Sequence, residues 1–313
     1  MTGKPRPVYG RRVRKFAIVL LILGVCACSD SSAARKKPTP PRIPEPGALT
    51  VTTDGRALVV GDRRLKRVVR VDLRTRARRV LASGFPEAIV GVGYDDMSRL
   101  YVSSGDRVYR IDGGRKVVVA GTGARGHTGD GGAATSAQLA GAGGIDVDHD
   151  EEIAIAEYDN WIRVVSSGGS ISSVAGNGGT GYAGDGGNAT AALLGHPHDV
   201  IWRRDKILIV ADSHNGVLRR IDGDGQIRTI ASGLSAPVDI AGGPGDVVYI
   251  ADAGRGVYRV PMDGGTPELM ARVASAFAVT VDYNGNAYVS QLDQRRVMKV
   301  TPQGRVTVFV PRS

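Results

Sequence analysis

Residues 195–233, GHPHDVIWRRDKILIVADSHNGVLRRIDGDGQIRTIASG, hold four strand-like runs and predict the local structure of the whole chain. The runs are HDVIW, KILIVAD, GVLRRI and IRTIAS, each rich in β-branched or apolar residues. Asp, Asn and Gly separate them, and these residues tolerate the backbone geometry of tight turns. The pattern therefore predicts four short antiparallel strands joined by hairpins.

This unit recurs six times along the chain, at a spacing of about 40 residues with two longer intervals in the middle. The ends of the second strands mark the copies: Asp62, Ser104, Glu157, Asp212, Asp252 and Gln291. A single unit leaves both faces of its sheet exposed, and six units stacked in a closed ring cover them. The sequence predicts an all-β, six-bladed β-propeller of four-stranded antiparallel blades over residues 48–313. The first and last units each hold four strands, so closure by whole blades is the simplest arrangement, and a blade shared between the two termini is the alternative.

Residues 1–28 have the layout of a secretory signal, because six basic residues precede an apolar run at 16–25 that is too short to span a bilayer. The run leads into Val25, Cys26, Ala27 and Cys28, which resembles the lipobox of bacterial lipoproteins. The resemblance implies acylation of Cys28 and a protein held to the membrane by lipid, extracytoplasmic, in a bacterial cell envelope. An ordinary signal peptide and an uncleaved anchor are the alternatives.

Residues 29–47, SDSSAARKKPTPPRIPEPG, contain five prolines and few apolar residues, which predicts an extended, disordered tether. Both cysteines lie in the signal segment, so the mature domain has no internal disulfide. Removal of the six basic residues of the signal lowers the formal net charge from +10 to +4. The high pI is therefore no argument for a nucleic-acid partner, and we expect a monomer that binds none.

Two insertions account for the longer intervals, and they are copies of each other. They read AGTGARGHTGDGGAATSAQL at 120–139 and AGNGGTGYAGDGGNATAALL at 175–194. We expect Asp130 and Asp185 of the GDGG blocks to accept backbone N–H bonds at the start of the Ala-rich segment that follows. A calcium loop would need six or more oxygen ligands, and each insertion offers one carboxylate, so we interpret both as structural.

Residues 48–310 resemble the NHL-repeat family of six-bladed propellers. In that family a VAG-x-G…GDGG-x-A-x-x-A-x-L segment leads into P-x-G-[apolar]-A-V-D, then YVAD, then N-x-x-[apolar]-R-[apolar]. The insertions and the IVAD run that ends at Asp212 follow this order, and the outer four units match it more loosely. The resemblance implies a binding or scaffold module whose partner is a protein, a peptide or a glycan.

The first strand of each blade lines the central channel of a propeller, so polar residues on these strands converge on one axis. Three first strands carry an aspartate there, at Asp146, Asp199 and Asp239, and His196 and His198 lie beside Asp199. We take these five as the candidate ligand-binding residues. The structural alternative is that Asp199 and Asp239 bond backbone N–H groups at the channel mouth, with His198 packed beside them.

The run Pro197-His198-Asp199 resembles the P-H-[DGS] motif with which peptidyl-hydroxyglycine amidating lyases hold a catalytic zinc through three histidines from three blades. This chain supplies the motif once, since Gly143 and Val238 stand at the matching places. The other histidines fall in a glycine loop, in a turn and after a second strand: His127, His149 and His214. Catalytic zinc needs three protein ligands, so we expect no such lyase activity and assign no catalytic residue.

Carboxylates suit a harder ion such as calcium, as in the gluconolactonase-like propellers, so the channel could hold a divalent cation. The alternative function is accordingly a metal-dependent hydrolase or lyase with its site at the channel mouth. We expect binding rather than turnover, with no other cofactor. The number of carboxylates and imidazoles that meet on the axis distinguishes the two functions.

Overall fold

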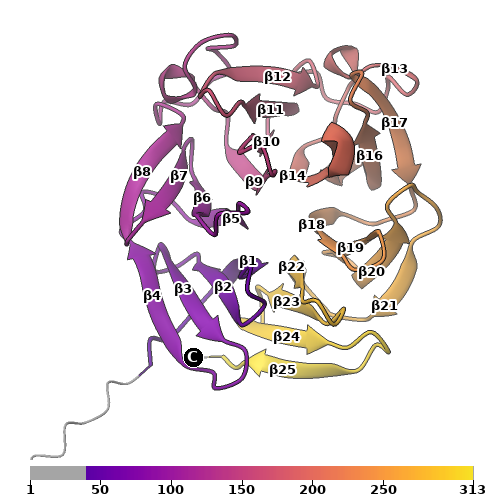
Figure 1. The fold of residues 1–313 in the computed structure, drawn as a ribbon. Coiled ribbons are helices and arrows are strands. Elements are labelled where there is room, and N and C mark those ends of the chain that lie inside the picture. The colour runs from indigo at the N-terminus through magenta and orange to yellow at the C-terminus, as the bar shows by residue number, and fades with distance from the viewer. Residues whose placement is uncertain (1–39, 313) are drawn as a thin grey trace, which may run out of the picture. The chain divides into compact units, whose positions relative to one another are not determined.

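The structure is a computed structural model and describes residues 40–312. Six antiparallel sheets form a ring around one axis (Figure 1), which confirms the predicted all-β, six-bladed propeller. The lipobox with Cys28 and most of the expected tether lie outside the described residues. Within residues 40–312, no helix has the length and apolar character needed to cross a membrane.

Each blade is a meander with its first strand at the axis and its fourth at the rim (Figure 1). The first strands are β1 (Pro46–Val51), β5 (Ile89–Tyr94), β9 (Ala142–Val147), β14 (Pro197–Arg203), β18 (Pro237–Gly243) and β22 (Ala276–Val281). The second strands are β2 (Ala57–Asp62), β6 (Leu100–Ser104), β10 (Ile153–Glu157), β15 (Ile207–Asp212), β19 (Val247–Asp252) and β23 (Ala287–Gln291).

The outer half of each blade completes the meander. The third strands are β3 (Arg67–Asp72), β7 (Val108–Asp112), β11 (Trp161–Val165), β16 (Val217–Ile221), β20 (Gly256–Pro261) and β24 (Arg296–Val300). The fourth strands are β4 (Arg78–Ser83), β8 (Arg115–Ala120), β12 (Ile171–Ala175), β17 (Gln226–Ala231), β21 (Glu268–Ala271) and β25 (Val306–Val310). The regular meander follows from short β-rich runs separated by turn residues.

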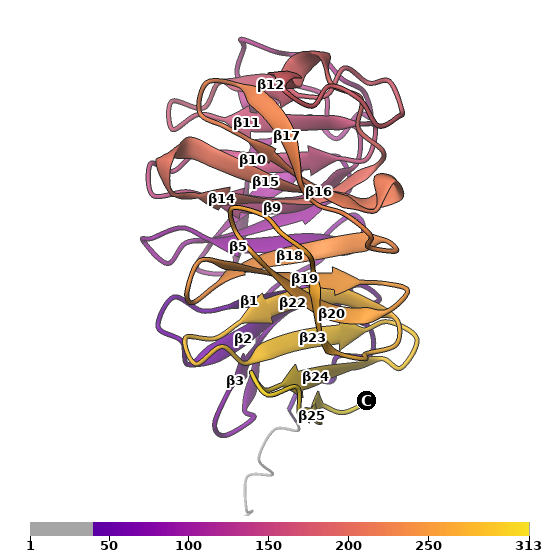
Figure 2. The same cartoon turned by 90° about the vertical axis from the view of Figure 1, so that its right-hand side faces the viewer.

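The hydrophobic core is divided among the six junctions between neighbouring blades. In one of these clusters Tyr101 and Val108 of blade two pack with Ile153 and Ile155 of blade three. Figure 2 shows the sheets from the side, stacked one against the next. Each blade therefore depends on its two neighbours to cover its faces.

The ring closes as predicted, with whole blades packed together. Strands β1 to β4 form one sheet and strands β22 to β25 form another. Strand β1 of the first blade contacts strand β22 of the last. Leu49 and Leu58 of blade one share a core cluster with Ala278 and Tyr288 of blade six. Side-chain packing, and no shared strand, therefore joins the last blade to the first.

The propeller begins before residue 48, inside the stretch assigned to the tether. Strand β1 starts at Pro46, which is compatible with a strand because its first residue can lack an N–H group. Ile43 is fully buried in the cluster between blades six and one. Because prolines surround Ile43, the sequence pattern assigned this buried residue to the disordered tether.

The two GDGG insertions extend the rims of blades three and four. The two-residue strand β13 (Gly187–Asn188) pairs with β17 as a fifth strand, and Ala133 forms a bridge with Ser170 at the rim of blade three. The Ala-rich segments become short 3-10 helices, η1 (Ala134–Ser136) and η2 (Ala189–Ala191). Two more 3-10 turns follow in blade four: η3 (Arg204–Lys206) and η4 (Ser213–Asn215).

The expected partners of the GDGG aspartates were wrong, although the loops do tie down structure. Asp130 Oδ1 accepts a bond from Arg163 Nη2 at 2.5 Å, and Asp185 Oδ1 accepts one from Arg219 Nη2 at 2.8 Å. The cap of η2 is Asn188, and η1 has no side-chain cap. The prediction placed the partners in the segment just after each aspartate. The arginines instead come from the third strand of the following blade, about 34 residues further along the chain.

Candidate functional site

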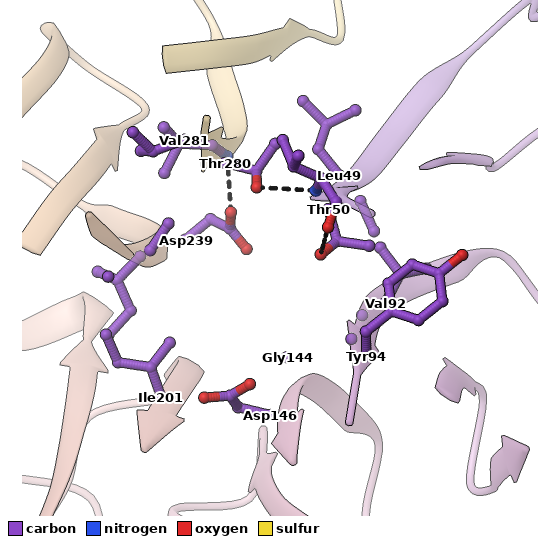
Figure 3. A pocket seen from close by; sticks show the side chains of 18 of the residues that line it. Leu49, Thr50, Val92, Tyr94, Gly144, Asp146, Ile201, Asp239, Thr280 and Val281 are labelled. Atoms are coloured by element: carbon purple, nitrogen blue, oxygen red, sulfur yellow. Dashed lines mark hydrogen bonds between the residues drawn. The ribbon is translucent and has the colours of Figure 1, made fainter. Parts of the chain in front are cut away.

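A cavity of about 350 Å³, which we call the axial cavity, lies on the axis of the ring (Figure 3). The first strands of all six blades line it, because a strand presents every second side chain to the same face. Asp146, Asp199 and Asp239 are among the lining residues. Within the described part of the chain, no Lys, Arg or His lines the cavity. The structure thus gathers the three predicted aspartates at one acidic site.

Each of these aspartates bonds a backbone N–H group on the first strand of the next blade. The bonds run from Trp202 N to Asp146 Oδ2 at 2.8 Å, from Ile240 N to Asp199 Oδ2 at 2.9 Å and from Val279 N to Asp239 Oδ2 at 2.6 Å. Thr280 Oγ1 continues the series by accepting from Val51 N at 3.2 Å. The carboxylates therefore hold neighbouring blades in register and are themselves held in place.

The three aspartates do not occupy equivalent positions. Asp199 and Asp239 each pair with the alanine that lies one residue before the end of the second strand. In blade three, Gly144 occupies the position on the first strand that corresponds to these aspartates. A side chain on Gly144 would collide with the carboxylate of Asp199, since its Cβ would lie 1.7 Å from Asp199 Oδ1. Asp146 lies two residues further along its own strand. Glycine in blade three therefore makes the room in which Asp199 lies.

Burial raises the pKa of all three carboxyl groups. Asp146 and Asp199 each reach a pKa of about 7, although backbone N–H bonds oppose the rise. The pKa of Asp239 rises well above its usual range, first because of burial and then because of the negative charge on Asp199. Asp146 and Asp239 keep some exposure to the cavity. Asp199 and Asp239 therefore titrate as a pair, in which burial and mutual repulsion disfavour ionisation of both groups.

The two predicted histidines lie outside the axial cavity, at the end of the channel where the first strands begin. His198 is the second residue of β14, and its ring centroid lies 4.9 Å from that of Tyr158 and 6.3 Å from that of Phe277. The Arg63 guanidinium lies 4.8 Å from the Phe277 ring centroid. Burial lowers the pKa of His198 to about 4, so its imidazole is neutral. The structure thus separates the five candidates into a carboxylate group and a histidine group.

Two histidines that the sequence pattern set aside also lie near this end. The His214 ring stacks on His196 with centroids 4.7 Å apart, and the His127 ring stacks on Trp161 at 3.8 Å. His127 stands in an insertion and His214 in η4, so neither follows the alternation that identifies channel residues. Folding of these loops beside β14 brings the imidazoles together, and no local pattern carries that information.

One group of three possible metal ligands is found within residues 40–312, and it lies away from the axial cavity. Asp148, His149 and Asp150 form it in the turn after β9. Lys206 Nζ lies 2.5 Å from a carboxylate oxygen of Asp148 and 2.5 Å from one of Asp150. An ammonium group is therefore already paired with both carboxylates.

No protein-family model matches the chain, and a search of curated proteins finds no match. Solved structures do match. A streptogramin B lyase shares 12% identity over 87% of this chain and 85% of its own, with a TM-score of 0.60. Virginiamycin B lyase from Staphylococcus aureus shares 15% identity over 86% and 85%, with a TM-score of 0.59. A chain of a nidogen/laminin complex shares 16% identity over 80% of this chain and 95% of its own, with a TM-score of 0.61.

At these identities the likeness shows the fold alone. The chain is a six-bladed β-propeller, an architecture found here both in lyases and in a complex between two proteins. The fold is thus compatible with binding and with catalysis, and the site residues must decide between them.

Proposed function

We propose that the chain is a lipid-anchored, extracytoplasmic NHL-repeat propeller that works as a binding module, with the axial cavity as its ligand site. The observation that carries the proposal is a cavity with three carboxylates and no lining Lys, Arg or His. Burial disfavours the charged form of these carboxyl groups, and a bound positive group offsets that effect. The ligand is a protein or peptide that inserts a basic side chain.

The hydrogen bonds of the carboxylates support binding over turnover. Each aspartate already accepts a backbone N–H group from the next blade, so its position is fixed by the fold. A fixed acceptor suits recognition of a donor such as an ammonium group, because little ordering is needed when the ligand binds. The ligand atoms of these aspartates do not form a close group of three, as the protein ligands of a catalytic zinc do.

The test uses a tetralysine peptide and isothermal titration calorimetry. The variant Asp146→Asn/Asp239→Asn keeps a side-chain oxygen at both positions and prevents both groups from ionising when a cation binds, so binding should weaken at least tenfold. Asp224→Asn makes a charge change in an exposed turn and serves as the matched control, with unchanged affinity expected. Equal binding by the double variant would exclude the axial cavity. Stoichiometric calcium in elemental analysis of the purified protein would favour the metal-dependent enzyme instead.

The membrane anchor has a separate test. Two or more acyl chains hold a protein stably on a bilayer, whereas one gives reversible binding. Cys28→Ala should therefore move the protein from the membrane fraction to the soluble fraction. Cys26→Ala is the matched control, because it leaves the residue that the lipobox resemblance marks for acylation. Intact-mass analysis that shows an unmodified mature chain would contradict the anchor.

A further inference from the structure

The junction of blades three and four contains a second cavity, of about 520 Å³, which we call the ring cleft. Its rings belong to His127, Tyr158, Trp161, His196 and His214. The ring cleft shares no lining residue with the axial cavity, so it is a different place on the molecule. A concave site lined by this many aromatic and imidazole rings is typical of small-molecule binding sites.

The rings are arranged in two stacks. Tyr158, His196 and His214 form one stack, with centroid separations of 4.7 Å and interplanar angles of 4° and 9°. His127 and Trp161 form the other, 3.8 Å apart and 14° from parallel. His214 ends the first stack and is exposed, and among residues 40–312 its single stacked neighbour is His196. The outer face of the His214 ring is therefore available to a further planar ring.

His196 carries one feature that the stability of the fold does not explain. Its Nδ1 atom is buried and has no hydrogen-bond partner in the described part of the chain. Its backbone has a φ of 53°, in the left-handed region that a histidine seldom adopts. Asn160 Oδ1 holds this conformation by accepting from His196 N at 2.7 Å. Gly141 and Ser275 also have a positive φ immediately before the first strands of blades three and six, so this conformation belongs to the blade architecture, and the unpartnered Nδ1 atom is the feature that points to a ligand.

Most other polar groups in the ring cleft are already occupied. Asn160 Nδ2 donates to Gly178 O at 3.3 Å and to Thr180 Oγ1 at 2.9 Å. Asp159 pairs with Arg125 at 2.7 Å. A ligand rich in hydroxyl groups would therefore find few free partners, whereas ring faces are open and the His214 nitrogens have no hydrogen-bond partner among residues 40–312.

The ring cleft is also close to neutral. Burial, followed by nearby positive charges, lowers the pKa of His127 and of His196, so both imidazoles are uncharged near pH 7. The carboxylate of Asp159 is balanced by Arg125. A strongly charged ligand gains little electrostatic attraction in such a site.

We propose that the ring cleft binds an uncharged, planar heteroaromatic ring. The ligand continues the stack on the outer face of His214, and its ring nitrogens or carbonyl groups exchange hydrogen bonds with the free nitrogens of that imidazole. This site is independent of the axial cavity and of the ligand proposed there.

The two tryptophans of the chain allow each cavity to be observed separately, because Trp161 lines the ring cleft and Trp202 lines the axial cavity. Trp202→Phe leaves Trp161 as the single reporter, and Trp161→Phe leaves Trp202. The probe is lumichrome, an uncharged three-ring heteroaromatic compound. Its addition should quench Trp161 fluorescence saturably in the first variant and should leave Trp202 fluorescence without saturable change in the second.

The stacking position is tested in the Trp202→Phe background. His214→Ala should weaken lumichrome binding at least tenfold, and His149→Ala, at an exposed histidine outside the ring cleft, should leave it unchanged. Unchanged binding by the His214 variant, or no saturable quenching of Trp161, would overturn the proposal. Calorimetric binding of cellobiose without binding of lumichrome would likewise overturn it, in favour of a saccharide site. Loss of tetralysine binding leaves these results unaffected, so the two proposals fail separately.

Discussion

Blades three and four differ from the other four blades at one position of the third strand. In the two central blades an arginine, Arg163 or Arg219, occupies this position and is fully buried. The residues that pair equivalently with the fourth strand in the other blades are Val69, Tyr109, Tyr258 and Met298. A guanidinium group has thus replaced an apolar or aromatic side chain within the same sheet architecture.

Two carboxylates compensate each buried guanidinium. Arg163 lies 3.4 Å from Glu157 at the end of its second strand and 2.5 Å from Asp130 of the insertion. Arg219 has the same arrangement, 3.4 Å from Asp212 and 2.8 Å from the Asp of the second GDGG block. The insertion supplies the closer carboxylate in both blades, so the buried arginine and the GDGG loop form one structural unit.

The insertions also place a ring against each guanidinium. His127 and Tyr182 occupy the same position in the two copies of the insertion. The Arg163 Nη1 atom lies 3.3 Å from His127 Nδ1, and the Arg219 guanidinium lies 5.3 Å from the Tyr182 ring centroid. A motif with the composition of a flexible loop is thus a packing element here, and its first copy contributes His127 to the ring cleft.

The largest effect is expected from breaking this unit in one central blade. Arg163→Met leaves Glu157 buried without its cationic partner, so the free energy of unfolding should fall by about 3 to 5 kcal/mol. Arg163→Met/Glu157→Gln removes both charges and should recover most of that loss. Urea denaturation measures both variants. Met298→Leu, at the equivalent position of blade six, should cost less than about 1.5 kcal/mol. A similar cost at both positions would remove the distinction between the blades.

A smaller effect on stability is expected from Asp146, a carboxyl group on the axis that has no cationic partner, in contrast to the paired charges within the blades. Burial raises the pKa of Asp146 from 3.8 to about 7, so the folded protein keeps a proton that the unfolded chain has lost. Stability from this group is present below pH 4 and declines as the pH rises to 7. Asp146→Asn keeps the acceptor for Trp202 N and should raise stability at pH 8 by about 1 to 2 kcal/mol, after discounting partial exposure.

The measurement for Asp146→Asn is thermal or urea unfolding at pH 5 and at pH 8. The gain of the variant over the wild-type protein should be larger at pH 8 than at pH 5, where only part of the loss has occurred. Asp224→Asn, which changes an exposed charge, should follow the wild-type curve at both values. The same pH dependence of stability in the wild-type protein and in Asp146→Asn would contradict the assignment of the loss to Asp146.

The next effect concerns the loop half of the arginine unit. Asp130→Asn weakens the bond to Arg163, but the Asp130 side chain is 47% exposed, so the loss should be about 0.5 to 1 kcal/mol. Amide hydrogen exchange should rise locally within residues 120–139. Asp112→Asn in blade two provides the control with an exposed ion pair. Uniform exchange across blade three, with no local rise, would argue against anchoring by Asp130.

The smallest effect is expected for an arginine of an outer blade. Arg110 follows Tyr109 on β7, pairs with Asp112 at 2.9 Å and is partly exposed. Arg110→Ala should change the free energy of unfolding by less than about 0.5 kcal/mol, because an exposed ion pair contributes little. A loss close to that of Arg163→Met would show that burial is not what separates the two kinds of blade.

The sequence alone determined the number of blades and their four-stranded meander, and it favoured closure by whole blades over a blade shared between the two termini. Each depends on short-range signals, namely β-rich runs, turn residues and a repeat spacing, which act within one unit of the chain. The same alternation placed Asp146, Asp199 and Asp239 on the axis. The start of the propeller was less accurate, since Ile43 lies among prolines and only its packing partners in blades one and six show that it belongs to the core.

The tertiary structure alone decided which charged residues are buried and which rings meet. Sequence reasoning treated every third-strand basic residue alike, yet Arg219 and Arg220, consecutive on β16, face opposite sides of the sheet: Arg219 is fully buried, like Arg163 at the equivalent position, while Arg220 lies beside Asp222. A shift of one residue reverses the face of a strand, so the outcome depends on the partner strand. His127, His196 and His214 come from an insertion, a strand entry and a turn, and only the packing of blade three on blade four brings them together.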